Sequence, residues 1–318
     1  MEAHGVKARH AMMRAVRSFR LALPIAAGVL ALLMTAPGAH AQEIEPRAYA
    51  NIPVGLNFVA VGYAYSQGDI SADSSVPLED ASLRIHATFL SYVRSFDFFG
   101  RSANVAVVVP YAWLSGSATF RGDQVEREVS GFGDPRLRIA VNLYGAPALS
   151  LEGFADYRQD LIIGVSVTVG VPLGQYDSDK LVNIGTHRWA VKPEIGISKA
   201  WGPLTLEAAA GVVFFTENDD FFHGHTLERA PIVSLQGHLI YNIYRGLWAA
   251  LDVVGYRGGR TTVDGKEGDD IHENVRVGLT FSFPVTQHSS IKLFGSTGAY
   301  ARTGASMTTG GIAWQVRW

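Results

Sequence analysis

Apolar and polar residues alternate along one segment of this chain after another. In VRVGLTFSFPV (275–285), Val277, Leu279 and Phe281 have one parity, and Arg276 and Thr280 have the other. Successive side chains of a β-strand point to opposite faces, so this period of two predicts strands with one apolar and one polar face. We therefore expect an all-β chain.

Such segments number about twelve, and an even count is typical of single-chain bacterial barrels. The predicted strands are 53–66, 80–95, 103–118, 133–144, 160–175, 188–200, 204–215, 230–244, 247–259, 271–284, 290–302 and 308–318. Most of them exceed the ~9–11 residues that a tilted strand needs to cross a bilayer. The long polar connections lie near 67–79, 119–132, 176–187, 216–229 and 260–270, and they alternate with shorter ones. A transmembrane barrel predicts this asymmetry, whereas a soluble β-sandwich does not.

The composition agrees with a barrel that faces lipid. Hydrophobic residues make up 47% of the chain and charged residues 18%, whereas soluble domains have roughly 25% charged residues. Aromatic residues cluster where the predicted strands end, as two interfacial girdles require: Tyr111, Trp113, Tyr176, Trp189 and Phe214 at one end, and Phe98, Tyr144, Trp201, Tyr244 and Trp318 at the other. We predict a transmembrane antiparallel up-and-down β-barrel.

Residues 1–41 have the features of a cleaved signal peptide. Arg14, Arg17 and Arg20 precede the apolar run 21–36, and Ala39-His40-Ala41 is a small-x-small cleavage site. The run is shorter than the ~20 residues of a membrane-spanning helix. We therefore expect a barrel formed by residues 42–318, exported to the outer membrane of a Gram-negative bacterium. Because the chain has no cysteine, a lipid-anchored lipoprotein is excluded.

The last predicted strand runs to Trp318, with apolar residues at alternating positions. Such a strand closes a barrel and carries its assembly signal, so we expect the barrel-assembly machinery as a partner. Outer-membrane lipid, lipopolysaccharide and a small-molecule solute are the other expected partners. With a formal net charge of −2, the chain lacks the basic excess typical of nucleic-acid binding.

The polar faces of the predicted strands carry mostly basic residues. If those faces line the lumen, the candidates for a constriction are Arg84, His86, Arg136, Arg138, Lys192, Glu194, His238, Arg276 and Lys292. A basic wall would attract anions and set selectivity. The same residues could instead form salt-bridge ladders that brace a closed interior, and the sequence leaves both interpretations open.

Metal and catalytic chemistry have little support. His223 and His225 lie beside Asp219 and Asp220, but no third ligand has a fixed spacing, so solvated loop residues are the simpler interpretation. A hydrolase site would need Ser, His and an orienting carboxylate or amide together, and His238 with Ser234 has no evident third member. We predict no catalytic residues, no cofactor and no enzyme activity.

Several longer strings resemble one protein family. They are GFGDPRLRIAV (131–141), YRQDLIIGVSVTVGVPLGQYD (157–177), NIGTHRWAVKPEIGISKAWG (183–202), GLWAALDVVGYRGGRTTVDG (246–265), NVRVGLTFSFPVTQHSSIKL (274–293) and GIAWQVRW (311–318). Together they are similar to the outer-membrane proteins of the MetA pathway of phenol degradation family. This resemblance implies an outer-membrane β-barrel and uptake of aromatic or other small organic compounds. It supplies no site residues.

We therefore expect a channel for passive uptake of a small organic solute, either aromatic or anionic. The alternative is a closed structural or surface-binding barrel without transport. An outer-membrane hydrolase is the third hypothesis.

Overall fold

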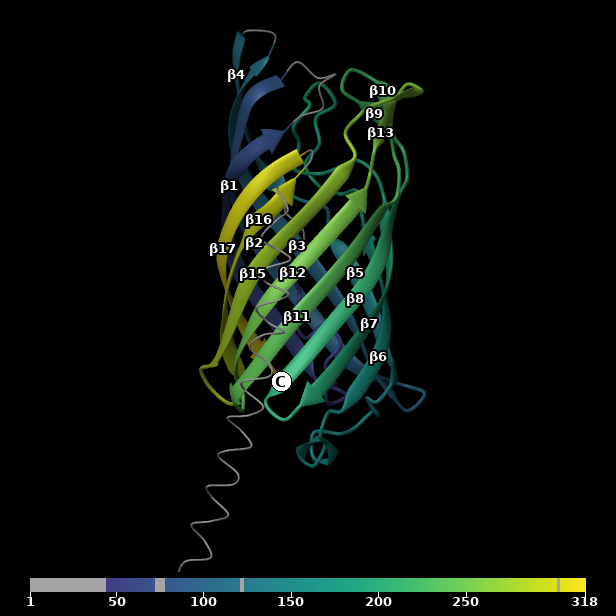
Figure 1. Ribbon diagram of the computed structural model, residues 1–318, viewed down its shortest axis with the longest axis vertical. Helices are drawn as coiled ribbons and strands as arrows, with labels where there is room; N and C mark the ends of the chain where they lie inside the picture. The colour runs from purple at the N-terminus through teal and green to yellow at the C-terminus, as the bar shows by residue number, and fades with distance from the viewer. Residues whose placement is uncertain (1–43, 72–77, 121–122, 302–303) are drawn as a thin grey trace, which may run out of the picture. The chain divides into compact units, whose positions relative to one another are not determined.

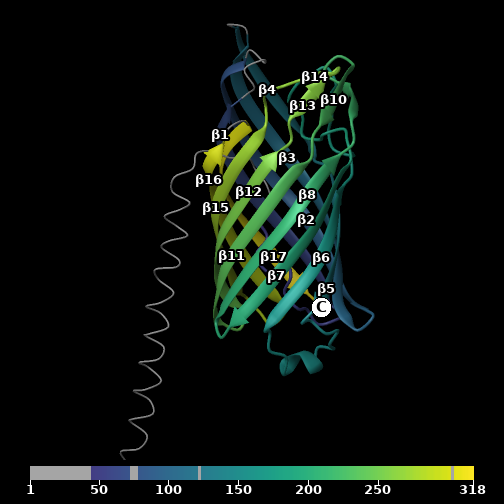
Figure 2. The same ribbon diagram turned by 45° about the vertical axis from the view of Figure 1, so that its right-hand side comes forward.

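The structure is a computed structural model that describes residues 44–71, 78–120, 123–301 and 304–318, so the predicted signal peptide, 1–41, lies outside the described residues. Twelve antiparallel strands form a closed barrel and are strongly tilted against its axis (Figures 1 and 2). They are β1 (Asn57–Ser71), β2 (Leu78–Phe98), β3 (Arg101–Phe120), β5 (Arg136–Tyr144), β6 (Leu161–Gly170), β7 (Ala190–Trp201), β8 (Leu204–Phe215), β11 (Ile232–Tyr244), β12 (Leu247–Gly258), β15 (His272–Pro284), β16 (Ser289–Ala301) and β17 (Gly304–Arg317). The predicted fold class is confirmed.

The barrel closes between its first and last strands. β1 pairs with β17 in a continuous antiparallel register from Phe58 opposite Arg317 to Ser71 opposite Gly304. Beyond that ladder, the backbone N–H groups of Asn57 and Trp318 each donate to the other residue's carbonyl, at 2.9 and 3.1 Å. Closure gives the backbone N–H and C=O groups of both edge strands hydrogen-bond partners. These groups need partners within the protein because lipid offers no water.

The two ends of the barrel differ. Short turns join the strands at one end, where the C-terminus and the 3-10 helix η1 (Gly153–Ala155) also lie (Figure 1). We call it the turn end. At the opposite end, which we call the loop end, a small sheet is built from β9 (Asn218–Phe221), β10 (His225–Arg229), β13 (Thr261–Val263) and β14 (Lys266–Glu267). The predicted asymmetry of the connections therefore matches the structure.

One predicted loop is a strand instead. Residues 119–132 include β4 (Asp123–Phe132), which pairs with the loop-end half of β3, while β5 pairs with the other half. The chain is interrupted only at 133–135 between β4 and β5. The first four residues of β4 are exposed and the other six alternate between half-buried and exposed, but no residue is buried, so the strand needs no continuous apolar face that the sequence could reveal. The gap at 303–307 between the predicted strands 290–302 and 308–318 is too long, because β17 already begins at Gly304.

The outward face of the barrel is an apolar belt. On this face a row of leucines crosses four neighbouring strands: Leu206 opposes Leu239, Leu239 opposes Leu251, and Leu251 opposes Leu279. Leu279 is 52% exposed although it is fully apolar, as are Ile195 and Leu235 at 55% and 60%. Such a belt is stable only against lipid. Among the residues that the structure describes, no helix is long and apolar enough to span a membrane.

The inward face carries small and polar residues and two apolar clusters. Ile232, Val254 and Tyr256 form one cluster near the loop end of β11 and β12, and Val213, Phe215 and Ile44 pack against it. Ile240, Trp248 and Ala250 form the other cluster. Ile44 precedes β1, so the segment before the first strand already lies inside the barrel.

Candidate functional site in the lumen

The N-terminal segment 44–56 occupies part of the lumen. Its central side chain, Tyr49, is only 2% exposed and lies on two inward glycines that oppose each other on β6 and β7, Gly164 and Gly196. A Cβ atom on Gly164 or Gly196 would lie 2.5 or 2.0 Å from the nearest ring carbon of Tyr49. Only glycine leaves room for the ring at either position.

The hydroxyl of Tyr49 reaches the charged wall of the barrel. It donates to Oε1 of Glu194 at 2.9 Å and lies 3.3 Å from Oγ of Ser166. The guanidinium of Arg138 lies 5.5 Å from the centre of the ring. Burial, followed by the negative charge of Glu194, raises the pKa of Tyr49 above its ordinary value, so the phenol remains neutral in this position.

Arg47 makes a second attachment. Its backbone N–H donates to Oε2 of Glu207 at 2.7 Å, its guanidinium donates to Asn242, and the guanidinium also lies 4.8 Å from the ring centre of Trp248. Burial lowers the pKa of Arg47, and the charge of Glu207 opposes that shift. The segment is thus held by a buried carboxylate, an amide and an aromatic ring.

Glu207 belongs to a larger inward polar network. Ser198 donates to its other oxygen at 2.9 Å. In the same row, His238 opposes Glu207 and Asp252, with its Nδ1 2.7 Å from Asp252, and Thr280 donates to the second oxygen of Asp252 at 2.8 Å. Every described member is almost fully buried, so the network braces the barrel wall rather than lining open space.

The segment is also fastened at the turn end. Ser95 donates from Oγ to the carbonyl of Pro53 at 2.6 Å, and Ser102 donates to the carbonyl of Ile52 at 3.1 Å. The backbone of Val54 and Gly55 bonds to Leu149 and Ser95. These contacts set the direction in which the segment enters the lumen before β1 begins.

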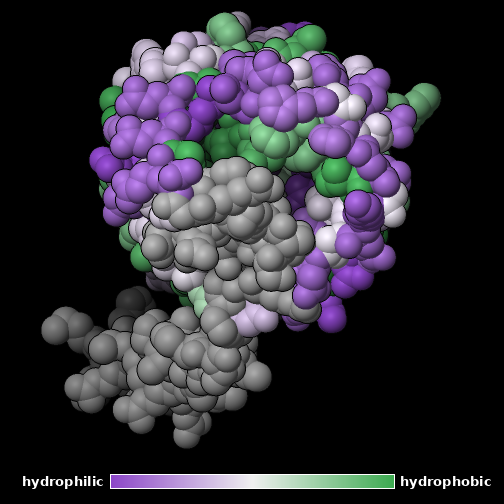
Figure 3. Space-filling view, turned by 90° about the horizontal axis from the view of Figure 1, so that it is seen from above, coloured by the Kyte–Doolittle hydropathy of each residue, from purple (hydrophilic) through white to green (hydrophobic). Residues whose placement is uncertain are grey.

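On the loop-end side of the segment lies a cavity of about 570 Å³. Its floor includes Glu45, Arg47 and Ala48 of the segment itself. Its basic wall consists of Arg136, Arg138, Lys192 and Arg229, and its apolar wall includes Val213, Phe215, Ile232 and Tyr256. Viewed from the loop end, a largely hydrophilic rim surrounds a hollow in which hydrophobic side chains are visible (Figure 3). The hollow combines positive charge with an apolar surface.

The basic residues of the wall lie in neighbouring rows. Arg138 opposes Thr168 on β6, and Thr168 opposes Lys192 on β7. Nζ of Lys192 forms an ion pair with Glu194 at 2.6 Å. In the next row toward the loop end, Arg136 opposes Gly170, Gly170 opposes Ala190, and Ala190 opposes Phe215. The small residues Gly170 and Ala190 therefore leave space between the guanidinium of Arg136 and the ring of Phe215.

The remaining predicted lumen residues divide into two groups. His238, Arg276 and Lys292 face inward but do not line the cavity. Arg276 is 1% exposed and donates to Ser296, Thr309 and the carbonyl of Met307, so it joins β15 to β16 and β17 as a brace.

Arg84 and His86 contradict the prediction, because they face outward. On β2 they share a face with Leu90 and Tyr92, which are exposed, whereas Val93 on the other face lines the cavity. His86 lies 2.6 Å from the hydroxyl of Tyr63. The apolar residues of the opposite parity, such as Leu83, fill the interior instead. Alternation separates two faces, but it does not say which one is inside.

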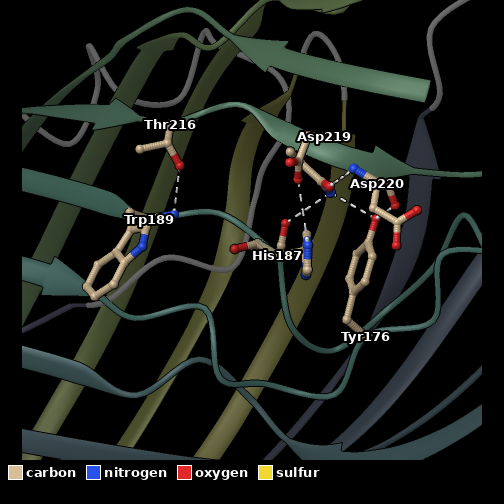
Figure 4. Close-up of polar contacts among 8 residues, drawn as sticks. Tyr176, His187, Trp189, Thr216, Asp219 and Asp220 are labelled. Carbon is tan, nitrogen blue, oxygen red and sulfur yellow. Dashed lines mark hydrogen bonds and ion pairs between the residues drawn. The ribbon is translucent and has the colours of Figure 1, made fainter. Parts of the chain in front are cut away.

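The loop end is ordered by contacts between connections. Figure 4 shows Tyr176 beside His187, with Asp219 and Asp220 nearby. The two rings stack at 4.7 Å, and Nε2 of His187 lies 3.9 Å from Asp219. The Tyr176 hydroxyl donates to the carbonyl of Asp220 at 3.0 Å. Tyr176 therefore belongs to this loop cluster and not to the predicted aromatic girdle.

Two buried arginines lie near Phe215 at the loop end, where Arg229 lines the cavity and Arg188 lies beside its lining. The guanidinium carbons of Arg188 and Arg229 lie 5.0 and 5.4 Å from the ring centre of Phe215. Burial, followed by the positive charge of Arg229, lowers the pKa of Arg188 to about 10. Burial also lowers the pKa of Arg229. Both groups remain charged at neutral pH.

The weak metal candidates are separated. His223 lies 3.2 Å from Asp179, whereas His225 lies 2.5 Å from Asp264 in a different connection. Within the described residues, no group of three or more His, Asp or Glu side chains could hold a metal ion. These histidines join loops to one another.

Sequence reasoning missed the segment 44–56 and the pair Arg188 and Arg229. The segment is too short and irregular to show a period. The two glycines beneath Tyr49 gave only a weak signal in the sequence. Gly164 and Gly196 fall at inward positions, but they become neighbours only once the register of β6 and β7 is known. Arg188 and Arg229 lie at the ends of predicted strands, where no alternation assigns them a face.

A family model described as "Putative MetA-pathway of phenol degradation" matches residues 64–318. Among solved structures, the chain is similar to the COG4313 outer membrane channel from Pseudomonas putida F1, with 19% identity and a TM-score of 0.73 over 87% of this chain and 100% of that one.

Other solved structures are less similar. The β domain of the autotransporter BrkA from Bordetella has 10% identity and a TM-score of 0.48 over 83% of this chain and 99% of that one. The transport unit of the autotransporter AIDA-I from Escherichia coli has 9% identity and a TM-score of 0.48 over 91% and 97%. No curated protein sequence matches. At these identities the likenesses concern the fold.

Proposed function

The chain belongs to the family described as "Putative MetA-pathway of phenol degradation", and from this premise and the lumen geometry we propose that it is an outer-membrane channel for passive uptake of a small organic solute. The observation that carries the proposal is the cavity of about 570 Å³ inside a barrel whose outward face is apolar. Its volume lies in the range of small-molecule sites. The similar structure from Pseudomonas putida, an outer membrane channel, supports the location.

The proposed orientation places the loop end outside the cell and the turn end in the periplasm, as long external loops and short periplasmic turns suggest. Arg84 and His86 would then lie near the external headgroups and could contact lipopolysaccharide. We further propose export by the signal peptide 1–41 and assembly through the last strand, which ends at Trp318. Mass spectrometry of the purified protein should find Gln42 at the N-terminus.

The constriction would lie where the segment 44–56 meets the basic wall. Arg136, Arg138 and Lys192 outnumber Glu194 there, so the local potential should favour anions over cations. Glu194 also accepts from Tyr49 and from Gln236 at 2.9 Å, and this satisfies it as an acceptor. His238, Arg276 and Lys292 would maintain the shape of the barrel rather than select the solute.

Single-channel recording in planar bilayers tests the channel. The wild type should conduct with a preference for anions, and Arg136→Glu combined with Arg138→Glu should reverse that preference. A matched pair at the turn end, Arg158→Glu with Arg245→Glu, should leave it unchanged, because both residues are exposed away from the cavity. An anion preference that survives the reversal at 136 and 138 would reject these residues as the selectivity determinant.

A closed barrel remains the second candidate, because the segment 44–56 occupies the lumen. It predicts no conductance and no swelling of proteoliposomes in any small solute, together with ligand binding that is lost when protease removes the external loops. Conductance in the wild type would reject it.

A further inference from the structure

Guanidinium N–H groups that have no acceptor lie in the cavity lining and beside it, because Arg138 lines the cavity and Arg188 packs on Phe215, which also lines it. Arg188 is only 8% exposed, and in the described part of the chain its Nε and Nη1 atoms are buried without a hydrogen-bond partner. Nη2 of Arg138 is in the same situation. A buried donor that lacks an acceptor costs free energy, and the cost is larger when the group is charged. Both residues therefore favour an acceptor that the described chain does not supply.

The nearby carboxylates are already engaged by neutral donors. Asp134 accepts from the backbone N–H groups of Gly174 and Thr186, at 2.9 Å each, and from the hydroxyl of Thr186 at 2.7 Å. Asp270 accepts from the N–H and the hydroxyl of Thr261, at 2.8 and 2.9 Å. The negative charge of Asp134 acts on Arg188 and that of Asp270 acts on Arg229, but among the described residues neither carboxylate accepts a hydrogen bond from these guanidinium groups.

Arg229 is held in place by uncharged acceptors. Nε donates to the carbonyl of Gly259 at 3.1 Å, and Nη2 donates to a ring nitrogen of His272 at 2.7 Å. Its charge therefore adds to that of Arg188 near the same ring, that of Phe215. Two like charges near one ring repel each other, and an anion close to both would offset that repulsion.

An apolar wall continues from this basic end into the cavity. Phe215, Val213, Ile232 and Tyr256 all line it. They pack together in one cluster with Val254, so the wall is preformed rather than assembled around a ligand. An anion with an apolar body would place its charge at the arginines and its body along this wall, whereas a bare inorganic ion would leave the wall uncovered.

We propose that the loop-end half of the cavity is a binding site for a small organic carboxylate, with Arg229 of the lining and the neighbouring Arg188 as the anchors for the carboxylate and the wall from Phe215 to Tyr256 as the surface for its apolar or aromatic body. This assignment names the substrate class of the proposed channel and rests on that function for its biological meaning. Guanidinium groups suit carboxylates because they present several N–H donors in one plane.

Isothermal titration calorimetry on the full chain in detergent tests the site with benzoate, acetate and benzyl alcohol. Benzoate should bind, acetate should bind at least about tenfold more weakly because it leaves the wall uncovered, and benzyl alcohol should bind weakly because it has no charge. Arg188→Gln should lower the affinity for benzoate at least about tenfold and leave the affinity for benzyl alcohol unchanged. Arg188→Lys should recover part of the affinity for benzoate.

Two further variants keep the result interpretable. Arg158→Gln removes an exposed arginine at the turn end and should leave benzoate binding unchanged. Ala190→Leu adds volume to the cavity lining without altering any charge and should weaken benzoate. Heat-modifiable migration on gels verifies that each variant is a folded barrel.

The site is overturned if folded wild type does not bind benzoate up to its solubility limit, if benzyl alcohol binds equally well, or if Arg188→Gln and Ala190→Leu both leave benzoate binding unchanged. Conductance recorded on the same preparations distinguishes the two proposals. A wild type that conducts but does not bind benzoate overturns this site alone, whereas one that binds benzoate but neither conducts nor transports it overturns the channel.

Discussion

Tyr49 rests on Gly164 and Gly196 because those residues present no Cβ atom to its ring. A tyrosine in a lumen normally has many places to lie, since inward side chains leave gaps of varied shape. Here two glycines at opposing positions create one flat seat, and Glu194 and Ser166 specify the direction of the hydroxyl. This side chain fixes the middle of the segment, while Arg47 and the contacts of Ile52 and Pro53 hold the residues on either side of it.

A single methyl group at the seat tests this argument. Gly196→Ala places Cβ 2.0 Å from Cε2 of Tyr49, so the ring must move, and overpacking of this kind costs about 1–3 kcal/mol. We expect a folded barrel in which the segment is displaced and single-channel conductance rises. Gly310→Ala, whose added Cβ would meet nothing within 4 Å, is the control. Equal conductance in the two variants would contradict the role of the seat.

Alkaline pH should release the same contact. Because the pKa of Tyr49 is raised above its ordinary value of 10.0, the buried site favours the neutral phenol. Stabilisation by this group is fully present below about pH 10 and is lost as the pH rises above it. Conductance of the wild type should therefore increase in that range. Tyr49→Phe keeps the ring, has no ionisable group and should show no such step, whereas an identical step would assign it to another residue.

At the scale of elements, Asp134 organises the loop end. It lies in the interruption between β4 and β5, and its two oxygens hold Gly174 and Thr186 at either side of the connection 171–189. That connection also carries His187 and Arg188. The interruption therefore does more than divide a strand, because it fixes the neighbouring loop over the cavity.

Removal of this carboxylate should loosen the loop and spare the barrel. Asp134→Ala leaves the backbone N–H groups of Gly174 and Thr186 without an acceptor, which costs about 1–3 kcal/mol each where they are buried and less where they reach water, whereas the Thr186 hydroxyl keeps the carbonyl of Arg188 at 3.3 Å. Limited proteolysis should cut within 171–189 faster, while the temperature of heat modification changes little. The Asp156→Ala variant, changed in the exposed turn next to η1, should be cleaved within 171–189 at the same rate as the wild type. A large loss of barrel stability would show that Asp134 supports the strands themselves.

At the scale of the whole molecule, the described barrel has a lipid-facing outer surface and a charged interior. The leucine row from Leu206 to Leu279 lies on its outward face. Apolar side chains stay exposed there because lipid, and not protein, covers them. The charged groups that would be costly in that belt are instead buried inside, where Glu194, Glu207 and Asp252 find partners.

A charge placed in the belt should therefore be costly. Leu279→Arg, at the middle of β15, is expected to lower the free energy of unfolding in lipid vesicles by about 2–4 kcal/mol. Leu181→Arg, in the connection at the loop end, should lower it by about 0–1 kcal/mol. Denaturant titration in vesicles measures both changes. Equal costs would show that Leu279 does not lie at mid-membrane depth.

Local alternation is enough to predict the number of barrel strands, their approximate bounds and the inward face of β5, β7, β11 and β15. A strand between lipid and a polar lumen must show this alternation, because each of its faces meets a different solvent. The same pattern assigns Arg136, Arg138 and Lys192 to the inward face, and all three line the cavity.

The contents of the lumen and the inward face of β2 depend instead on tertiary contacts. Tyr49 contacts residues that are 117 and 145 positions away in the chain, and no local pattern encodes such a meeting. On β2, both faces carry a plausible mixture, so Arg84 and His86 receive their outward position only from the register with β1 and β3. The physical reason is the same in both cases: a period of two defines two faces, but closure of the barrel decides which face is inside and what shares that interior.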